Sequence, residues 1–153
     1  MNRKIVIAMA VLTIVVTIFI GFTTASNPVG GIHAETRLTR HVFRGAEDTE
    51  IPWVYIYVVN PTWQTVDVES VQCDTYAQGV FHPEWSARIT PDWHPERWDI
   101  KVLPFETSVV LWMGWTNEEG IPEGIYTLDF TIYATVMGED IEFKTKCEFM
   151  VFL

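Results

Sequence analysis

The sequence predicts an all-β protein: an antiparallel β-sandwich of seven or eight strands, preceded by one N-terminal transmembrane helix. Three observations support this prediction. The chain opens with an uncharged apolar run, Ile5 to Phe22. After it, short segments rich in Val, Ile, Thr and aromatic residues recur about every 8–14 residues, with turn residues between them. No segment beyond the apolar run has the i, i+3, i+4 apolar spacing of an amphipathic helix.

The apolar run is long enough to span a bilayer. Its eighteen residues would form roughly 27 Å of helix, close to the thickness of the hydrocarbon core. Arg3 and Lys4 precede it, so the positive-inside rule keeps this end in the cytoplasm and exports the rest. A signal peptide cleaved after Ala25 is the alternative, and it would secrete the domain. The length favours an uncleaved signal anchor over residues 1–26, with a single pass through the cell membrane.

The remaining residues suffice for one domain with one core. The NPVGG stretch predicts a linker over residues 27–33, followed by a sandwich over 34–153. Residues 1–26 hold two basic and no acidic residues, so the exported part carries eight Lys and Arg against twenty Asp and Glu, a formal charge of −12. Such a surface repels nucleic acid, so we expect no nucleic-acid partner.

The strongest β segment is Trp53 to Val59, where every residue is aromatic or β-branched. Because it is apolar on both faces, it is either covered on both sides or presents aromatic residues to a partner. Asn60-Pro61-Thr62 then predicts a turn. In the next strand, Trp63 to Cys73, the apolar parity changes, which predicts a β-bulge near Ser70.

The clearest pattern is a C-terminal hairpin. Residues 125–136 and 141–152 both alternate between apolar and polar side chains, and Met137 to Asp140 connect them. This period of two predicts one face on the core and one in water. Weaker strands are expected at residues 36–43, 85–90, 97–103 and 108–115.

Three motifs stand in a familiar order: the Asn60-Pro61-Thr62 turn, Leu103 to Thr107 (LPFET) before a β run, and Ile121 to Leu128 (IPEGIYTL). This order resembles the immunoglobulin-like modules of bacterial and archaeal surface proteins, of the cell-adhesion-related type. Phe105 stands where those modules have Gly. The resemblance covers residues 53–153 and implies an immunoglobulin-like sandwich with adhesion, spacing or assembly roles. Anchored β-sandwich subunits of the archaellum have a similar layout.

Cys73 and Cys147 are the only cysteines. In an oxidising compartment two cysteines most often pair, so we expect a disulfide; two separate buried thiols are the alternative.

Two near-duplicate segments carry His-Pro-Glu. His82, Glu84 and His94, with Asp92 and Glu96, are weak candidates for a Zn or Cu site. Their spacing matches no established metal motif, so solvent-exposed loops are the favoured interpretation and we expect no metal or other cofactor.

Trp85, Trp93 and Trp98 lie in or beside loops with acidic neighbours. Aromatic rings of this kind suit a protein contact or, alternatively, a glycan-binding surface. No catalytic motif is present in the sequence, so we expect no enzyme. The predicted function is a cell-surface structural or interaction subunit. Its expected partners are other envelope proteins or copies of itself; a carbohydrate-binding module is the alternative.

The fate of the leader sets the mass of the mature protein. We expect the full 17.6 kDa chain in the membrane fraction, because the apolar run is longer than a usual signal-peptide core. Intact-mass spectrometry of the purified protein measures this directly. A mass lower by that of residues 1–25 would instead establish a cleaved signal peptide.

Overall fold

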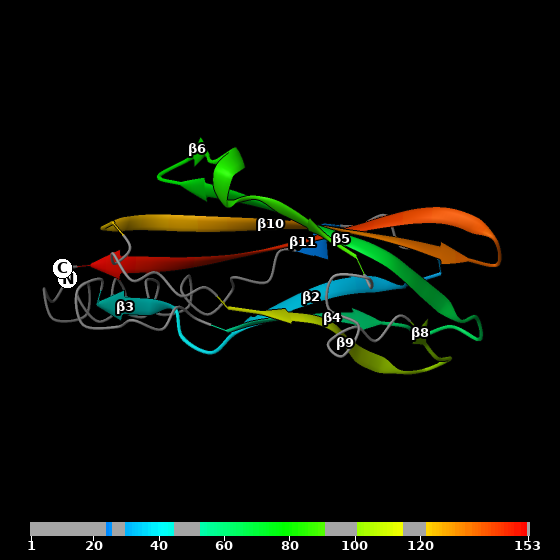
Figure 1. Ribbon diagram of the computed structural model, residues 1–153. Coiled ribbons are helices and arrows are strands. Elements are labelled where there is room, and N and C mark those ends of the chain that lie inside the picture. The colour runs from blue at the N-terminus through cyan, green and yellow to red at the C-terminus, as the bar shows by residue number, and fades with distance from the viewer. Residues whose placement is uncertain (1–23, 26–29, 45–52, 91–100, 115–121, 153) are drawn as a thin grey trace, which may run out of the picture.

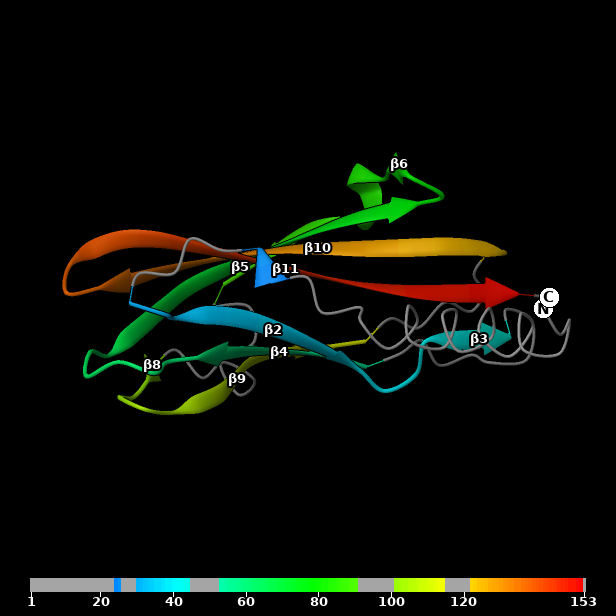
Figure 2. The same cartoon turned by 180° about the vertical axis from the view of Figure 1, so that it is seen from behind.

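The computed structural model of the chain describes residues 24–25, 30–44, 53–90, 101–114 and 122–152. These residues form two sheets packed face to face, so the prediction of an all-β, sandwich-like protein is confirmed (Figures 1 and 2). They contain no α-helix, only the 3-10 turn η1 (Pro83–Trp85). No helix within these ranges is long and apolar enough to cross a membrane. The predicted anchor lies outside the described residues, except for Thr24 and Ala25.

Three long strands form the centre of the larger sheet. Strand β10 (Gly124–Val136) pairs with β11 (Glu139–Phe152) on one side and with β5 (Val66–Ala77) on the other, both antiparallel. Shorter strands pair along the two outer edges of this sheet. These are β1 (Thr24–Ala25) and β3 (Val42–Arg44) on β11, and β6 (Val80–Phe81), β7 (Ala87–Ile89) and β8 (Lys101–Val102) on β5.

The smaller sheet has β4 (Val54–Val59) between β2 (His33–Leu38) and β9 (Thr107–Met113). Most of the predicted Trp53–Val59 strand therefore forms the central strand of the smaller sheet, with one face buried rather than both. Its burial alternates: Val54, Ile56 and Val58 are buried, while Tyr55 and Tyr57 are half-buried on the outer face. The predicted strand over residues 36–43 is divided between β2 in the smaller sheet and β3 in the larger.

The C-terminal hairpin matches its predicted pattern closely. All six apolar side chains of β10 from Tyr126 to Val136 are buried against the second sheet. The connection is the two-residue turn Met137-Gly138, in which both residues have positive φ (55° and 82°). The predicted bulge is confirmed: Tyr133 of β10 pairs with Ser70 of β5, but the next residue, Ala134, pairs with Val68, so the register shifts between these two pairs.

A polar contact also joins the two sheets along one side. Thr36 of β2 is buried, and its Oγ1 donates a hydrogen bond to the backbone carbonyl of Lys146 on β11 at 2.9 Å. Four residues further along β11, the backbone carbonyl of His41 accepts a hydrogen bond from the amide of Met150. These bonds satisfy polar groups on the outer edge of β11 that would otherwise be available to another strand.

Asn60, in the turn between β4 and β5, is the most densely bonded side chain of the described core. It is 1% exposed. Its Nδ2 donates to the carbonyls of Gln64 (2.6 Å), Val102 (3.2 Å) and Leu103 (3.0 Å). Its Oδ1 accepts from the amide and the hydroxyl of Thr62. One amide therefore holds the β4–β5 turn to the chain that leaves β8.

The N-terminal approach to β2 packs on the same turn. A Cβ at Gly30 would lie 3.0 Å from Cγ2 of Thr62, and one at Gly31 would lie 3.2 Å from Cγ of Pro61. Ile32 is completely buried. Residues 30–32, which the sequence assigned to a linker, thus pack at this end of the sandwich.

We expect Asn60→Ala to lower the free energy of unfolding by about 2–4 kcal/mol, because the carbonyl of Val102, which is buried, and those of Gln64 and Leu103, which are partly buried, lose their donor. Urea denaturation of the purified protein measures this change. Gln64→Ala is the matched control, since its carbonyl rather than its side chain accepts from Asn60, and it should cost less than about 0.5 kcal/mol. Equal losses for the two variants would contradict the role given to the Asn60 amide.

Candidate interaction surfaces

The segment from β6 through η1, which we call the flap (residues 80–85), is fixed to strand β5 by backbone and side-chain bonds. The His82 amide donates to the carbonyl of Thr75 at 2.8 Å, and the Thr75 hydroxyl donates to the carbonyl of Trp85 at 3.0 Å. Ser86 Oγ accepts from the Thr75 amide and donates to the His82 carbonyl. The flap is therefore packed on the larger sheet through hydrogen bonds to β5.

His82 and Glu84, the metal candidates that the structure describes, bond to each other. Nδ1 of His82 lies 2.7 Å from Oε1 of Glu84. This hydrogen bond lowers the pKa of the Glu84 carboxyl. Within the described residues no group of three or more His, Cys, Asp or Glu side chains could hold a metal ion. His94, Asp92 and Glu96 lie outside them.

Trp85 has contacts on more than one side. The His82 ring stacks on it at 4.1 Å with an interplanar angle of 11°, and the Tyr126 ring lies 6.2 Å away. A sugar would need an open ring face for stacking, and His82 already occupies one face. Trp93 and Trp98, the other predicted binding residues, lie outside the described part of the chain.

Tyr126 connects the flap to the core. Its ring stacks on Phe149 at 5.1 Å, and Phe149 meets Phe43 edge to face at 5.7 Å. Its hydroxyl donates to the carbonyl of Pro122 at 2.8 Å, and burial raises the pKa of this hydroxyl. Trp85 thus covers the outer end of an aromatic series and has a structural role.

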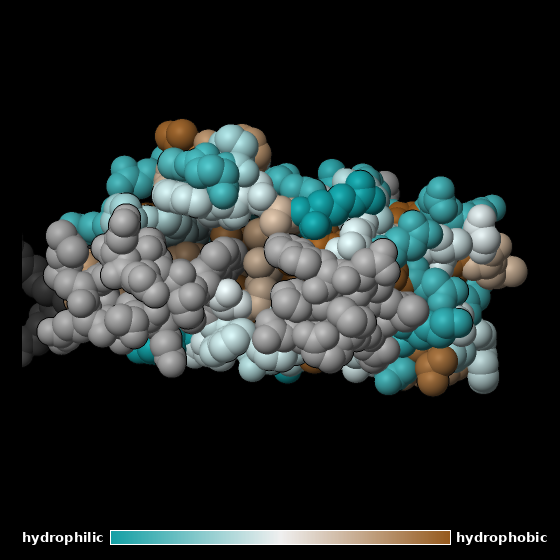
Figure 3. Space-filling view, viewed as in Figure 1, coloured by the Kyte–Doolittle hydropathy of each residue, from teal (hydrophilic) through white to brown (hydrophobic). Residues whose placement is uncertain are grey.

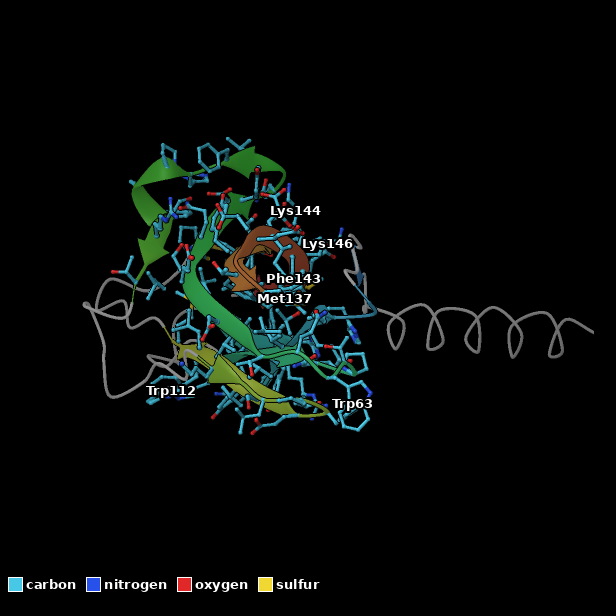
Figure 4. The ribbon with its side chains drawn as sticks, turned by 90° about the vertical axis from the view of Figure 1, so that its right-hand side faces the viewer. Trp63, Trp112, Met137, Phe143, Lys144 and Lys146 are labelled. Atoms are coloured by element: carbon cyan, nitrogen blue, oxygen red, sulfur yellow. The ribbon has the colours of Figure 1, made fainter. Side chains whose placement is uncertain are left out.

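The outer face of the smaller sheet also carries aromatic rings. Trp53 and Trp112 contact each other at 4.9 Å, and the Arg37 guanidinium lies 4.7 Å from the ring of Tyr57. Figure 4 shows Trp112 on the outer side of this sheet. Because these side chains cover one another, the face stabilises itself in the way that cross-strand pairs do.

The two most exposed large apolar side chains, those of Trp63 and Met137, lie at the opposite end of the sandwich from the flap. Three turns meet there: β4–β5, β8–β9 and β10–β11 (Figure 1). We call their apolar residues the tip surface: Trp63 (84% exposed), Met137 (79%), Phe105 (57%) and Leu103 (54%). Figure 3 shows apolar atoms at this end and again over β6.

Contacts across the turns hold the tip surface in place. The rings of Trp63 and Phe105 meet edge to face at 4.5 Å. The amide of Phe105 donates to the carbonyl of Thr62, which ties the β8–β9 turn to the β4–β5 turn. Nε2 of Gln64 lies 2.8 Å from Sδ of Met137. Seen end-on in Figure 4, Trp63 and Met137 lie on separate turns of this end.

Sequence reasoning missed the tip surface. It assigned Trp63 to a strand and Met137 to a connection, and it noted Phe105 only as a departure from Gly. One signal could have indicated it: a large apolar residue stands at a turn position that usually holds Gly or Asn. A side chain at such a position projects from the turn and does not join the core.

Cys73 and Cys147 do not form the predicted disulfide; both are buried free thiols. Cys73 on β5 faces Phe130 of β10, and Cys147 on β11 faces Leu128 of β10. Two strand spacings put their Cα atoms at least roughly 9 Å apart, beyond the limit of about 7 Å for a bridge. The prediction rested on the number of cysteines, which does not reveal that β10 lies between the two strands that carry them.

Comparisons with protein-family models and with curated proteins give no match to this chain. Inference about its function therefore rests on its own surfaces.

We expect both thiols to be unreactive in the folded protein. Burial raises the pKa of Cys73 to about 12, and it raises the pKa of Cys147 as well, so little reactive thiolate forms at ordinary pH. A thiol reagent should label neither cysteine until denaturant is added, and Gln78→Cys, with its exposed thiol, serves as the control. An intact mass lower by two hydrogens would contradict the free-thiol assignment.

Proposed function

We propose that this protein is a membrane-anchored, extracytoplasmic immunoglobulin-like module that acts as a structural and protein-interaction subunit of the cell surface. The anchor and the location rest on the sequence: the apolar run, the basic residues before it and the acidic composition after it.

Strand order supports the immunoglobulin-like assignment. One sheet with order β2–β4–β9 and another with order β11–β10–β5 correspond to strands A-B-E and G-F-C of that fold. The Tyr126 hydroxyl bonded to the Pro122 carbonyl, at the start of the F-like strand, matches the tyrosine corner of such domains. The usual disulfide joins strands B and F, whereas the cysteines here lie on the C-like and G-like strands.

The observation that carries the functional proposal is the exposure of large apolar side chains at the ends of the sandwich. The tip surface lies at one end, and Val80, Phe81 and Ile125 are exposed at the other. Large apolar residues gathered on the surface mark interaction sites, and aromatic residues and Met are enriched in protein interfaces. The archaellum-type role would be one case of such an assembly.

Glycan binding is the less supported alternative. It would use loop tryptophans, but Trp85 stacks on His82 and covers Tyr126. We therefore assign Trp85 first to the stability of the flap.

The proposal predicts that a partner co-purifies with the protein from solubilised membranes and depends on an end surface. We expect the pair Trp63→Ser with Phe105→Asn, or the pair Phe81→Ser with Val80→Ser, to reduce recovery of the partner at least about tenfold, a loss of about 1.4 kcal/mol of binding. Affinity purification with quantitative mass spectrometry gives the ratio.

Thr131→Ala, on the polar outer face of β10, is the matched control and should leave recovery unchanged. Thermal unfolding of each variant separates lost binding from lost folding. Recovery of the same partners by both end variants, or fractionation of the protein with the cytosol, would contradict the proposal.

A further inference from the structure

Two residues of the tip surface occupy backbone conformations that disfavour them. Phe105 has φ 59° and Met137 has φ 55°. This left-handed region is sterically unfavourable for residues with a Cβ, and glycine or asparagine adopts it at least cost. Met137-Gly138 has positive φ at both turn positions, which is where Asn-Gly is preferred in a hairpin. Folding alone therefore favours other residues at both positions.

The opposite end of the sandwich provides an internal comparison. Gln78-Gly79, between β5 and β6, has nearly the same pair of φ values, 51° and 81°. There the strained residue is polar. At the tip the strained residues are large, apolar and more than half exposed, so they contribute little to the core. Strained residues that point into solvent are a mark of functional sites.

Hydrogen bonds hold the turns beneath the exposed rings in place. The side-chain amide of Asn60 donates to the carbonyls of Gln64, in the β4–β5 turn, and Leu103, after β8. The backbone N–H of Asn60 donates to the carbonyl of Glu106. The Leu103 amide donates to Oε2 of Glu106 at 3.0 Å. A surface whose side chains are already ordered loses less entropy when a partner binds.

Acidic residues outnumber basic ones on the turns and strand ends that carry the tip surface. Asp67, Glu106, Glu139 and Asp140 lie on the turns and strand ends of the tip, whereas Lys101 is the basic residue in the same part of the described chain. Lys101 lies 3.6 Å from Asp67 and so pairs with one of these acids. The rim of the tip surface is therefore negatively charged.

We infer that the tip surface docks into an apolar pocket of a different protein, and that the rim of this pocket carries Lys or Arg side chains. The projecting Trp63–Phe105 pair and Met137 fit a concave partner, and the acidic rim selects a basic one by charge complementarity. A tip-to-tip contact between two copies would bring two acidic rims together, and an anionic lipid surface would repel the same carboxylates. This inference deepens the proposed interaction role and rests on it.

Site-specific photo-crosslinking in intact cells that make the full chain tests this inference. The photoreactive residue p-benzoylphenylalanine replaces Phe105, Met137 or, as the control with matching turn geometry at the opposite end, Gln78. We expect positions 105 and 137 to crosslink one and the same other protein, with a yield at least about tenfold above position 78. The crosslinked segment of that protein should be apolar and flanked by Lys or Arg, and the yield should fall in about 0.5 M salt.

Crosslinks only to copies of this chain, only to lipid, to a segment without basic flanks, or to nothing would overturn the inference. So would an equal yield at position 78. If the partner is instead lost only when the flap end is changed, this inference fails while the proposed interaction role stands.

A second measurement separates docking from folding. Met137→Asn places the preferred residue in the Met-Gly turn, so we expect the Tm to stay level or to rise by about 2–4 °C, while crosslinking from position 105 falls at least about tenfold. A clear drop in Tm with crosslinking retained would assign Met137 to folding and overturn its role in docking.

Discussion

A single buried amide determines how one end of this sandwich is built. Strand ladders satisfy backbone polar groups along the sheets, but they end at the turns, where buried carbonyls still need donors. Asn60 supplies donors there, to Gln64, Val102 and Leu103, and its oxygen accepts from Thr62. Hydrogen bonds thus hold the turns beneath the tip surface together without the side chains of Trp63 and Phe105, which face outward.

Local sequence patterns predicted the parts of the fold that are set locally. The alternation in β10 and β11 gave the hairpin and its buried face, and the change of parity near Ser70 gave the bulge. Which strands become neighbours depends on distant residues. No pattern near Val42 indicates that β3 pairs with β11, and no spacing rule places β10 between Cys73 and Cys147. The predicted fold class was therefore correct at the level of two packed β-sheets, while the disulfide was wrong.

The candidate surfaces show the same contrast between features that local sequence predicts and features that depend on distant residues. Trp85 was found from its acidic, loop-like surroundings, but its role depends on His82 and Tyr126, which the fold brings to it. The tip surface was missed because exposure at a turn follows from backbone dihedral angles that composition does not reveal. Phe105 in place of a turn glycine was the one visible sign. Large apolar residues at such positions are worth flagging from sequence, since a core role is closed to them.

The β11 edge of the larger sheet bears on the proposal that a partner binds at the ends of the sandwich. A sandwich can bind a partner by adding a strand to an open edge. Along β11, however, β1 pairs with Lys144 and Thr145, the carbonyl of Lys146 accepts from Thr36, and β3 pairs with residues 150–152. These contacts cover much of that edge with the chain's own groups, which also protects it from aggregation. A partner approaching this edge meets backbone groups that are already bonded within the chain, which favours recognition through side chains presented by the turns.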